Sequence, residues 1–289
     1  MKHGGMVERI GNILPEGLRT ALGFHYKKYI FHRYLRNVFG NRYQPQSPGP
    51  MPPAELITTE ALLHQNDLNI RAKPDWYFGS GCREAWTVLT MLEQCSFNLR
   101  SMRCVLEFGC GSARVLRHLR NIADLQLAGT DANPKAIAWD RESLLGIDFQ
   151  QNELTPPLAF DDEKFDLVYA LSVFTHIPLK WQRPWLDELR RVLAPGGYLL
   201  CTVLGHNFVR FQLSQEDREE LERCGALTLD SKHPRASYSS QVLGSWDVFQ
   251  ARDQVRSIFG AGFEILCYTT EAAAAGQDTL VLQKTSSVG

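Results

Sequence analysis

The sequence predicts an α/β fold, in which helices cover both faces of a doubly wound, mostly parallel sheet. Short apolar runs at 105–108 and 165–170 have the length and continuity of buried parallel strands. Segments with apolar residues at helical spacing alternate with these runs. Turns rich in glycine or proline separate the two kinds of segment. The order of elements therefore favours strand–helix–strand units.

Length and composition are those of an ordinary soluble globular protein. The 289 residues suffice for one good core with an appendage, and 44% are hydrophobic against 22% charged. Residues 1–50 contain eight Lys and Arg against two Glu, a net charge of +6, and the remainder has 23 against 30, a net charge of −7. The acidic main part is therefore not expected to hold nucleic acid by charge.

Cysteine usage predicts a reducing, cytoplasmic environment. The seven cysteines form no Cys-x-x-Cys pair and no zinc spacing, and several lie in apolar runs, where a free thiol behaves as a small hydrophobe. No apolar signal segment follows Met1, and no apolar run approaches the roughly 20 residues that span a bilayer.

The first 50 residues are expected to form a basic, helical extension. Residues 15–43 mix basic and aromatic side chains at loosely helical spacing. Such a helix either makes a peripheral membrane contact or packs against the main domain as an accessory helix. Five prolines between Pro45 and Pro53 then predict a stiff linker, so the domains are taken as 1–50 and 51–289.

The stretch after the strand at 105–108 is a glycine turn that suits a nucleoside cofactor. Two kinds of site compete, a dinucleotide site and an S-adenosylmethionine site. The dinucleotide fingerprint needs a small residue where this chain has the large, charged Arg114. An acid followed by two glycines and a small residue (Glu107, Gly109, Gly111, Ala113) instead resembles motif I of the class I S-adenosylmethionine-dependent methyltransferases.

A second strand at 125–130 ends at Asp131, 22 residues after Gly109. A carboxylate here accepts hydrogen bonds from both ribose hydroxyls. Asn133 and Pro134 follow as the N-cap and first residue of a helix. After a third strand at 147–150, Asn152 is expected to meet the adenine amino group.

The segments FDLVYALSVFTHIP (165–178) and LDELRRVLAPGGYLL (186–200) make the resemblance specific. They are similar to segments of class I methyltransferases, in particular to bacterial members that modify small molecules and glycans. The resemblance covers 51–285 and implies a Rossmann-like sheet of seven strands with the seventh antiparallel, and S-adenosyl-L-methionine as cofactor. It implies cofactor contacts at Tyr77, Gly79, Glu107, Gly109, Cys110, Gly111, Ala113, Asp131, Ala132, Asn152, Glu153 and Leu171.

Other segments are assigned within this scheme. The loop 75–81 is expected to fold over the methionine moiety of the cofactor. Residues 205–245 form an insertion that shapes the acceptor side, with a helix at 214–224. A helix at 248–259 and strands at 263–269 and 279–283 complete the pattern.

The predicted reaction is a metal-independent methyl transfer to an oxygen or nitrogen of a small-molecule or glycan-type acceptor. A nearby base must accept the acceptor's proton, and His176 and His206 follow the fourth and fifth strands. The alternative for each of these histidines is a purely structural role. The sequence patterns of three other methylation reactions are absent after the fourth strand. These are Asn/Asp-Pro-Pro-Tyr for adenine or glutamine amino groups, Pro-Cys for cytosine C5, and acidic metal ligands for metal-assisted catechol methylation. The alternative is a catalytically silent, S-adenosylmethionine-binding regulatory or scaffold protein.

Overall fold

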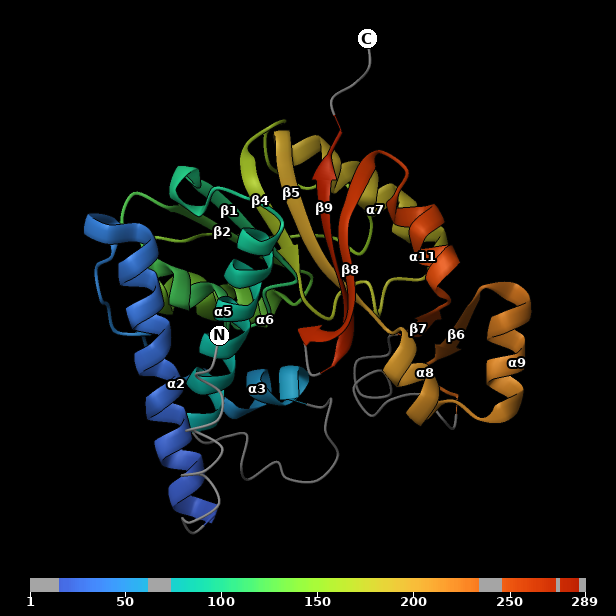
Figure 1. Cartoon of the computed structure of the whole chain (residues 1–289), viewed down its shortest axis with the longest axis horizontal. Coiled ribbons are helices and arrows are strands. Elements are labelled where there is room, and N and C mark those ends of the chain that lie inside the picture. Colours follow the sequence, from blue (N-terminus) through green and yellow to red (C-terminus); the bar gives the residue numbers. More distant parts are fainter. Residues whose placement is uncertain (1–15, 62–73, 234–245, 274–275, 286–289) are drawn as a thin grey trace.

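The computed structural model describes residues 16–61, 74–233, 246–273 and 276–285. A seven-stranded sheet, in the order β3-β2-β1-β4-β5-β9-β8, forms its centre (Figure 1). β9 runs antiparallel to both neighbours, whereas the other pairings are parallel. The predicted fold class is therefore confirmed. The strands are β1 Cys104–Phe108, β2 Gln126–Asp131, β3 Asp148–Gln151, β4 Phe165–Ala170, β5 Leu193–Val203, β8 Phe263–Ala273 and β9 Gln277–Lys284.

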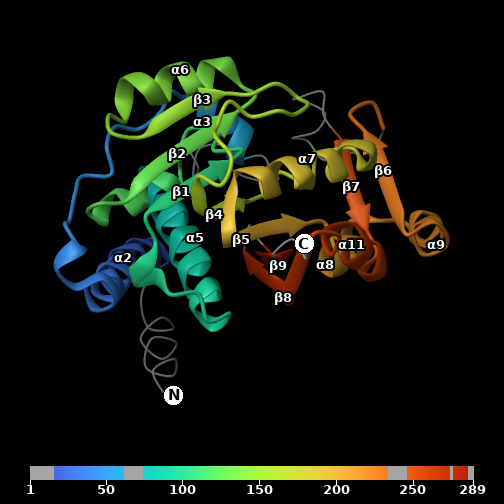
Figure 2. The ribbon, with the colours of Figure 1, turned by 90° about the horizontal axis from the view of Figure 1, so that it is seen from above.

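Helices cover both faces of this sheet (Figures 1 and 2). Successive strand residues point to opposite faces, so Val105 lies in one buried cluster and Leu106 in the other. The first face carries α2 (Glu16–Phe39), α5 (Pro74–Gln94), the 3-10 helix η3 (Leu116–Asn121) and α6 (Pro134–Ser143). The second carries α7 (Leu179–Val192) and α11 (Arg252–Phe259). Three short helices of the described residues precede β1, namely η1 Gly40–Arg42, α3 Ala54–Ala61 and η2 Leu99–Ser101.

Residues 16–39 of the N-terminal extension form one continuous helix, α2, although their apolar spacing is only loosely helical. Phe31, Leu35 and Phe39 are buried in the same cluster as the inner face of α5, and the Tyr34 hydroxyl donates to Glu93 of α5. This packing supports the accessory-helix interpretation for the second half of α2, because Phe31, Leu35 and Phe39 are covered by the main domain, whereas Tyr29 is exposed. Among the described residues, no helix has both the length and the apolar character to cross a membrane.

The proline-rich stretch lies against the main domain. Arg42 donates to the carbonyl oxygens of Ala123, Arg100 and Met102, and the Gln44 N–H donates to Asn121. The division of the chain at residue 50 stays a prediction, but residues 42–50 are bonded to the edge of the domain.

Arg117 continues this attachment from inside the protein. Its side chain is fully buried and donates to the carbonyl oxygens of Pro48, Pro50, Ala113 and Ser112 at 2.7–3.3 Å. The guanidinium carbon lies 5.1–5.6 Å from the ring centroids of Tyr77, Phe78 and Trp139. Aromatic faces and carbonyl dipoles thus surround the buried cation.

A smaller unit follows β5. It consists of α8 (His206–Gln212), α9 (Gln215–Cys224) and an antiparallel ribbon of β6 (Ala226–Asp230) and β7 (Trp246–Gln250), around its own apolar cluster. Ser214 and Asp217 form the capping box that starts α9. Residues 234–245 of the predicted insertion lie outside the described residues.

Two helix predictions differ from the structure. The helix expected from Val248 is wrong, because 246–250 form β7 and α11 begins only at Arg252. Pairing with β6, and a bond from the Val248 N–H to the Thr175 carbonyl, outweigh the local helical spacing. The helix expected after the glycine turn is the short η3.

His118 makes the fold acid-sensitive. Burial, with Arg117 as the next cause, lowers the pKa of His118 to about 3, against about 6.5 in an unfolded chain. Between these values only the unfolded chain binds the proton, so stability falls as pH decreases, by up to about 1.4 kcal/mol per pH unit. Between pH 7 and pH 5, the free energy of unfolding measured with urea should fall less for His118→Gln than for the wild type. Equal losses would contradict this assignment.

Candidate functional site

The glycine turn after β1 is held between β2 and the loop that follows β4. The N–H groups of Gly109 and Cys110 both donate to the Thr130 carbonyl, at 2.7 and 3.0 Å. Gly109 has a φ of +76°, and a Cβ there would lie 2.3 Å from Cγ2 of Val173. Gly111 and Ala113 also have positive φ, so three of the predicted residues shape one tight turn.

Asp131 ties this turn to the end of β2. Its Oδ2 accepts the Gly111 N–H and its Oδ1 accepts the Asn133 N–H, both at 2.8 Å. Burial raises the pKa of Asp131, while these two backbone bonds oppose that rise. Asn133 caps α6 and Pro134 opens it, as predicted. The half-buried carboxylate thus stands at the carboxyl end of the sheet, with Ala132 beside it.

Glu107 faces inward from β1. Its buried Oε2 accepts the Leu116 N–H at 3.0 Å, where η3 begins. The buried Tyr169 hydroxyl has a pKa well above its ordinary value, through burial and the nearby Glu107. In this structure, Glu107 holds the segment that follows the turn.

Tyr77 and Gly79 lie within α5 and not in a loop, which corrects the prediction for 75–81. The Tyr77 side chain is fully buried, and its hydroxyl donates to the Ser112 carbonyl at 3.0 Å. A Cβ on Gly81 would lie 2.0 Å from the Arg114 carbonyl oxygen. Helix α5 therefore touches the glycine turn directly. In the sequence, the three small residues Gly79, Ser80 and Gly81 could have indicated this close approach.

Asn152 follows β3 beside Asp131. Its Oδ1 accepts the Thr130 hydroxyl and its Nδ2 donates to the Glu153 carbonyl, both at 2.7 Å. Its N–H donates to the Asp131 carbonyl. These bonds place Asn152 and Glu153 at the same edge as Asp131, whereas the Leu154 side chain is 73% exposed.

The two histidines are held differently. His176, in the loop after β4, has Nδ1 2.7 Å from the Trp246 carbonyl oxygen and 3.8 Å from Oδ1 of Asp247. His206 begins α8 and is exposed, and its backbone N–H donates to Asp278. Burial raises the pKa of Asp278.

Two further side chains complete this edge. Leu171 is partly buried against the first core cluster. Ser172 has a φ of +58°, and its Oγ accepts Nε2 of the buried Gln277 at 2.9 Å. Trp185 lies away from this edge, since it is buried and packs on Phe108 in the second core.

Comparisons with known proteins agree with this geometry. Residues 106–201 match the family described as "Methyltransferase domain". A probable phthiotriol/phenolphthiotriol dimycocerosates methyltransferase 2 of Mycobacterium ulcerans is 35% identical over 100 residues, which cover 32% of this chain and 36% of that protein. A ubiquinone biosynthesis O-methyltransferase of Cereibacter sphaeroides is 29% identical over 116 residues, covering 38% and 44%.

Residues 106–201 therefore form a methyltransferase domain, and the order of the seven strands is the one expected for a class I, S-adenosylmethionine-dependent member. The chain spans less than half the length of these relatives. A solved structure of a putative sarcosine dimethylglycine methyltransferase from Galdieria sulphuraria shares the fold, with a TM-score of 0.50, 13% identity and coverage of 89% of this chain and 98% of that chain.

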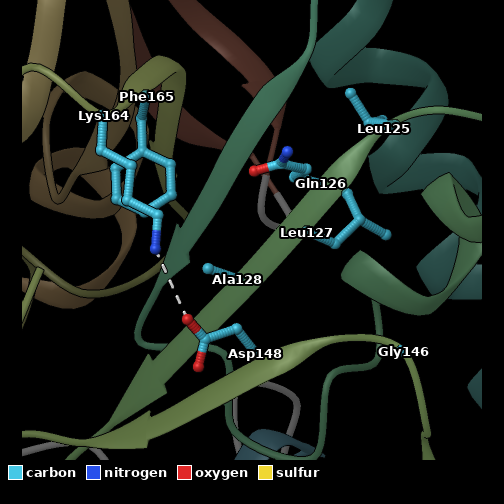
Figure 3. Close-up of a pocket in the computed structure, with 8 residues that line it drawn as sticks. All are labelled: Leu125, Gln126, Leu127, Ala128, Gly146, Asp148, Lys164 and Phe165. Carbon is cyan, nitrogen blue, oxygen red and sulfur yellow. Dashed lines mark ion pairs between the residues drawn. The ribbon is translucent and has the colours of Figure 1, made fainter.

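The methyltransferase domain has a pocket of about 320 Å³ at the opposite edge of the sheet (Figure 3). Gln126, Asp148 and Phe165 are the first residues of β2, β3 and β4, and all three line this pocket. Lys164 pairs with Asp148 there at 3.5 Å. Ligands of open α/β sheets bind beyond the carboxyl ends of the strands, so this pocket is separate from the predicted cofactor site.

The described residues were also examined for a cluster of metal ligands. In the described ranges, no group of three or more His, Cys, Asp or Glu side chains is arranged to hold an ion. The metal-independent reaction stays a prediction.

Gly109 gives a direct test of the turn in the methyltransferase domain. Gly109→Ala adds a Cβ against Val173 at a positive φ, whereas Gly146→Ala adds one at a φ of +89° with no atom within 4 Å. Backbone strain costs about 1–2 kcal/mol in both variants, and overpacking adds about 1–3 kcal/mol at Gly109 alone. Denaturant unfolding should show this difference, and Val173→Ala should restore part of it. Equal destabilisation would contradict the close packing of turn and loop.

Proposed function

We propose that this protein transfers a methyl group from S-adenosylmethionine to an oxygen or nitrogen of a small-molecule or glycan-type acceptor, without a metal ion. The observation that carries the proposal is the bond between Asp131 and the glycine turn. Asp131 at the end of β2 accepts the Gly111 N–H at 2.8 Å, so the carboxylate and the turn form one rigid edge.

The residues at this edge fit the nucleoside part of the cofactor. A carboxylate offers about four lone-pair positions, and each Asp131 oxygen accepts one described backbone N–H. Each oxygen therefore keeps a lone pair for a ribose hydroxyl. Asn152 supplies polar groups beside it, and Gly109 and Gly111 let the backbone come close to the ligand. Glu107 and Tyr77 support the turn from behind.

The methyl-transfer chemistry needs little more from the protein than position and a proton acceptor. When bound, the cofactor supplies a sulfonium methyl group that a lone pair can attack. The neighbouring protein groups orient the acceptor, and a hydroxyl acceptor loses a proton to a base. His176 and His206 are the candidate bases. The named relatives methylate small molecules, which favours a small-molecule acceptor here.

Calorimetric titration of the full chain with S-adenosylmethionine and with S-adenosylhomocysteine tests the cofactor site. We expect binding by the wild type and an affinity about 10- to 100-fold lower for Asp131→Ala, because hydrogen bonds to a charged group are worth about 1.5–3 kcal/mol. Asp148→Ala is the matched control, since Asp148 begins β3 at the opposite edge. It should bind like the wild type.

The outcomes separate the candidate functions. Equal affinities for Asp131→Ala and the wild type would refute this cofactor site. Binding lost in Asp131→Ala, followed by methyl transfer in a screen of small phenols, amines and sugars, would establish the reaction. Binding without transfer to any of them would favour the regulatory or scaffold protein.

A further inference from the structure

The β6–β7 ribbon is bonded to the loop that carries His176. The Val248 N–H of β7 donates to the Thr175 carbonyl at 2.9 Å. That loop packs on the glycine turn through Val173, whose Cγ2 occupies the space beside Gly109. The ribbon, the loop and the turn are therefore in continuous contact, although the ribbon is about 70 residues further along the chain.

Two buried glutamines fix this arrangement. Nε2 of Gln182 in α7 donates to the Phe174 and Ile177 carbonyls, at 3.2 and 3.1 Å. Its Oε1 accepts Nε2 of Gln250 in β7 at 2.9 Å, and both glutamines are at most 2% exposed. Buried amide groups that bond to each other hold a defined geometry, although Oε1 of Gln250 has no partner among the described residues. The loop and β7 are thus kept in one register on either side of His176.

The ribbon also determines which nitrogen of His176 carries the proton. Nδ1 lies 2.7 Å from the Trp246 carbonyl oxygen. A carbonyl oxygen only accepts, so Nδ1 must carry the hydrogen, and in the neutral ring Nε2 is the basic nitrogen.

Asp247 lies on the same side of the ring. Its Oδ1 is 3.8 Å from Nδ1, and its side chain is 3% exposed. A nearly buried carboxylate at this distance favours a proton on Nδ1, the ring nitrogen that faces it. His206 also has a carboxylate nearby, since its ring acts electrostatically on Asp278. Its hydrogen bond to Asp278, however, comes from the backbone N–H, and among the described residues no hydrogen bond to its ring selects the protonated nitrogen.

We infer that His176 is the proton acceptor of the methyl transfer and that Asp247, together with the Trp246 carbonyl, is its positioning partner. This inference rests on the proposed function. A lone pair of the acceptor oxygen forms the new O–C bond as the methyl–sulfur bond breaks and its electron pair stays on sulfur. The hydroxyl proton moves to Nε2 of His176 and later leaves to water.

Nitrogen-15 NMR of the full chain labelled at histidine tests the inference without any turnover. The His176 signals are assigned from their loss in His176→Gln. We expect the wild type to show a protonated Nδ1 and an unprotonated Nε2. The opposite tautomer in the wild type would overturn the inference, and it would do so whatever the calorimetric titration shows.

Asp247→Asn tests the carboxylate itself. Because the negative charge that favours a proton on Nδ1 is removed, the fraction of the Nε2-protonated tautomer should rise several-fold. Asp230→Asn is the matched control, since Asp230 pairs with Trp246 in the same ribbon but is exposed at its end. It should keep the wild-type tautomer. Unchanged tautomers in a folded Asp247→Asn would remove Asp247 from the proposal.

The proposed function is decided separately by cofactor binding. If S-adenosylmethionine binds and an acceptor from the screen is methylated, Asp247→Asn should lower kcat about 10-fold or more while KM stays near the wild-type value. An unchanged kcat would overturn the positioning role. A failure to bind the cofactor would refute the proposed function and would leave the tautomer measurement valid.

Discussion

The buried guanidinium of Arg117 is the interaction on which much of the first face of the sheet depends. It joins four segments, since its hydrogen bonds reach Pro48, Pro50 and the glycine turn, and its flat faces contact rings from α5 and α6. A buried cation is tolerated only when dipoles or charges replace its water. Here carbonyl oxygens and aromatic rings do so. The proline-rich stretch is therefore part of the support of the turn, because two of its carbonyls solvate this charge.

Much of the fold and of the cofactor edge was predictable from the sequence, because the signals are local. The run at 165–170 coincides with β4, and the N-cap at Asn133 fixes where β2 ends and places Asp131 at its end. Spacing along one strand–turn–helix unit is enough to place a carboxylate beside a glycine turn. These positions need no knowledge of distant contacts.

The remaining features depend on contacts between distant segments. Residues 248–250 were expected to begin a helix, yet they pair with β6 and become part of a strand. Tyr77 and Gly79 precede an apolar stripe, which suggested a loop, but α5 starts earlier because Gly81 lets it approach the turn. Asp247 carries no local motif at all. Its proximity to His176 follows from the docking of the ribbon, which no periodicity encodes.

The two halves of the proposed site are assembled from contacts of different sequence separation. The contacts that build the proposed cofactor half join residues 20 to 35 apart, such as Gly111 with Asp131 and Tyr77 with Ser112, so it closes at a smaller entropic cost. The ring of His176 is fixed only after a segment about 70 residues away has docked. Partial unfolding that frees the ribbon would leave nucleoside affinity intact while the proton acceptor loses its orientation. The ribbon then acts as a late-folding unit on which turnover, but not cofactor retention, depends.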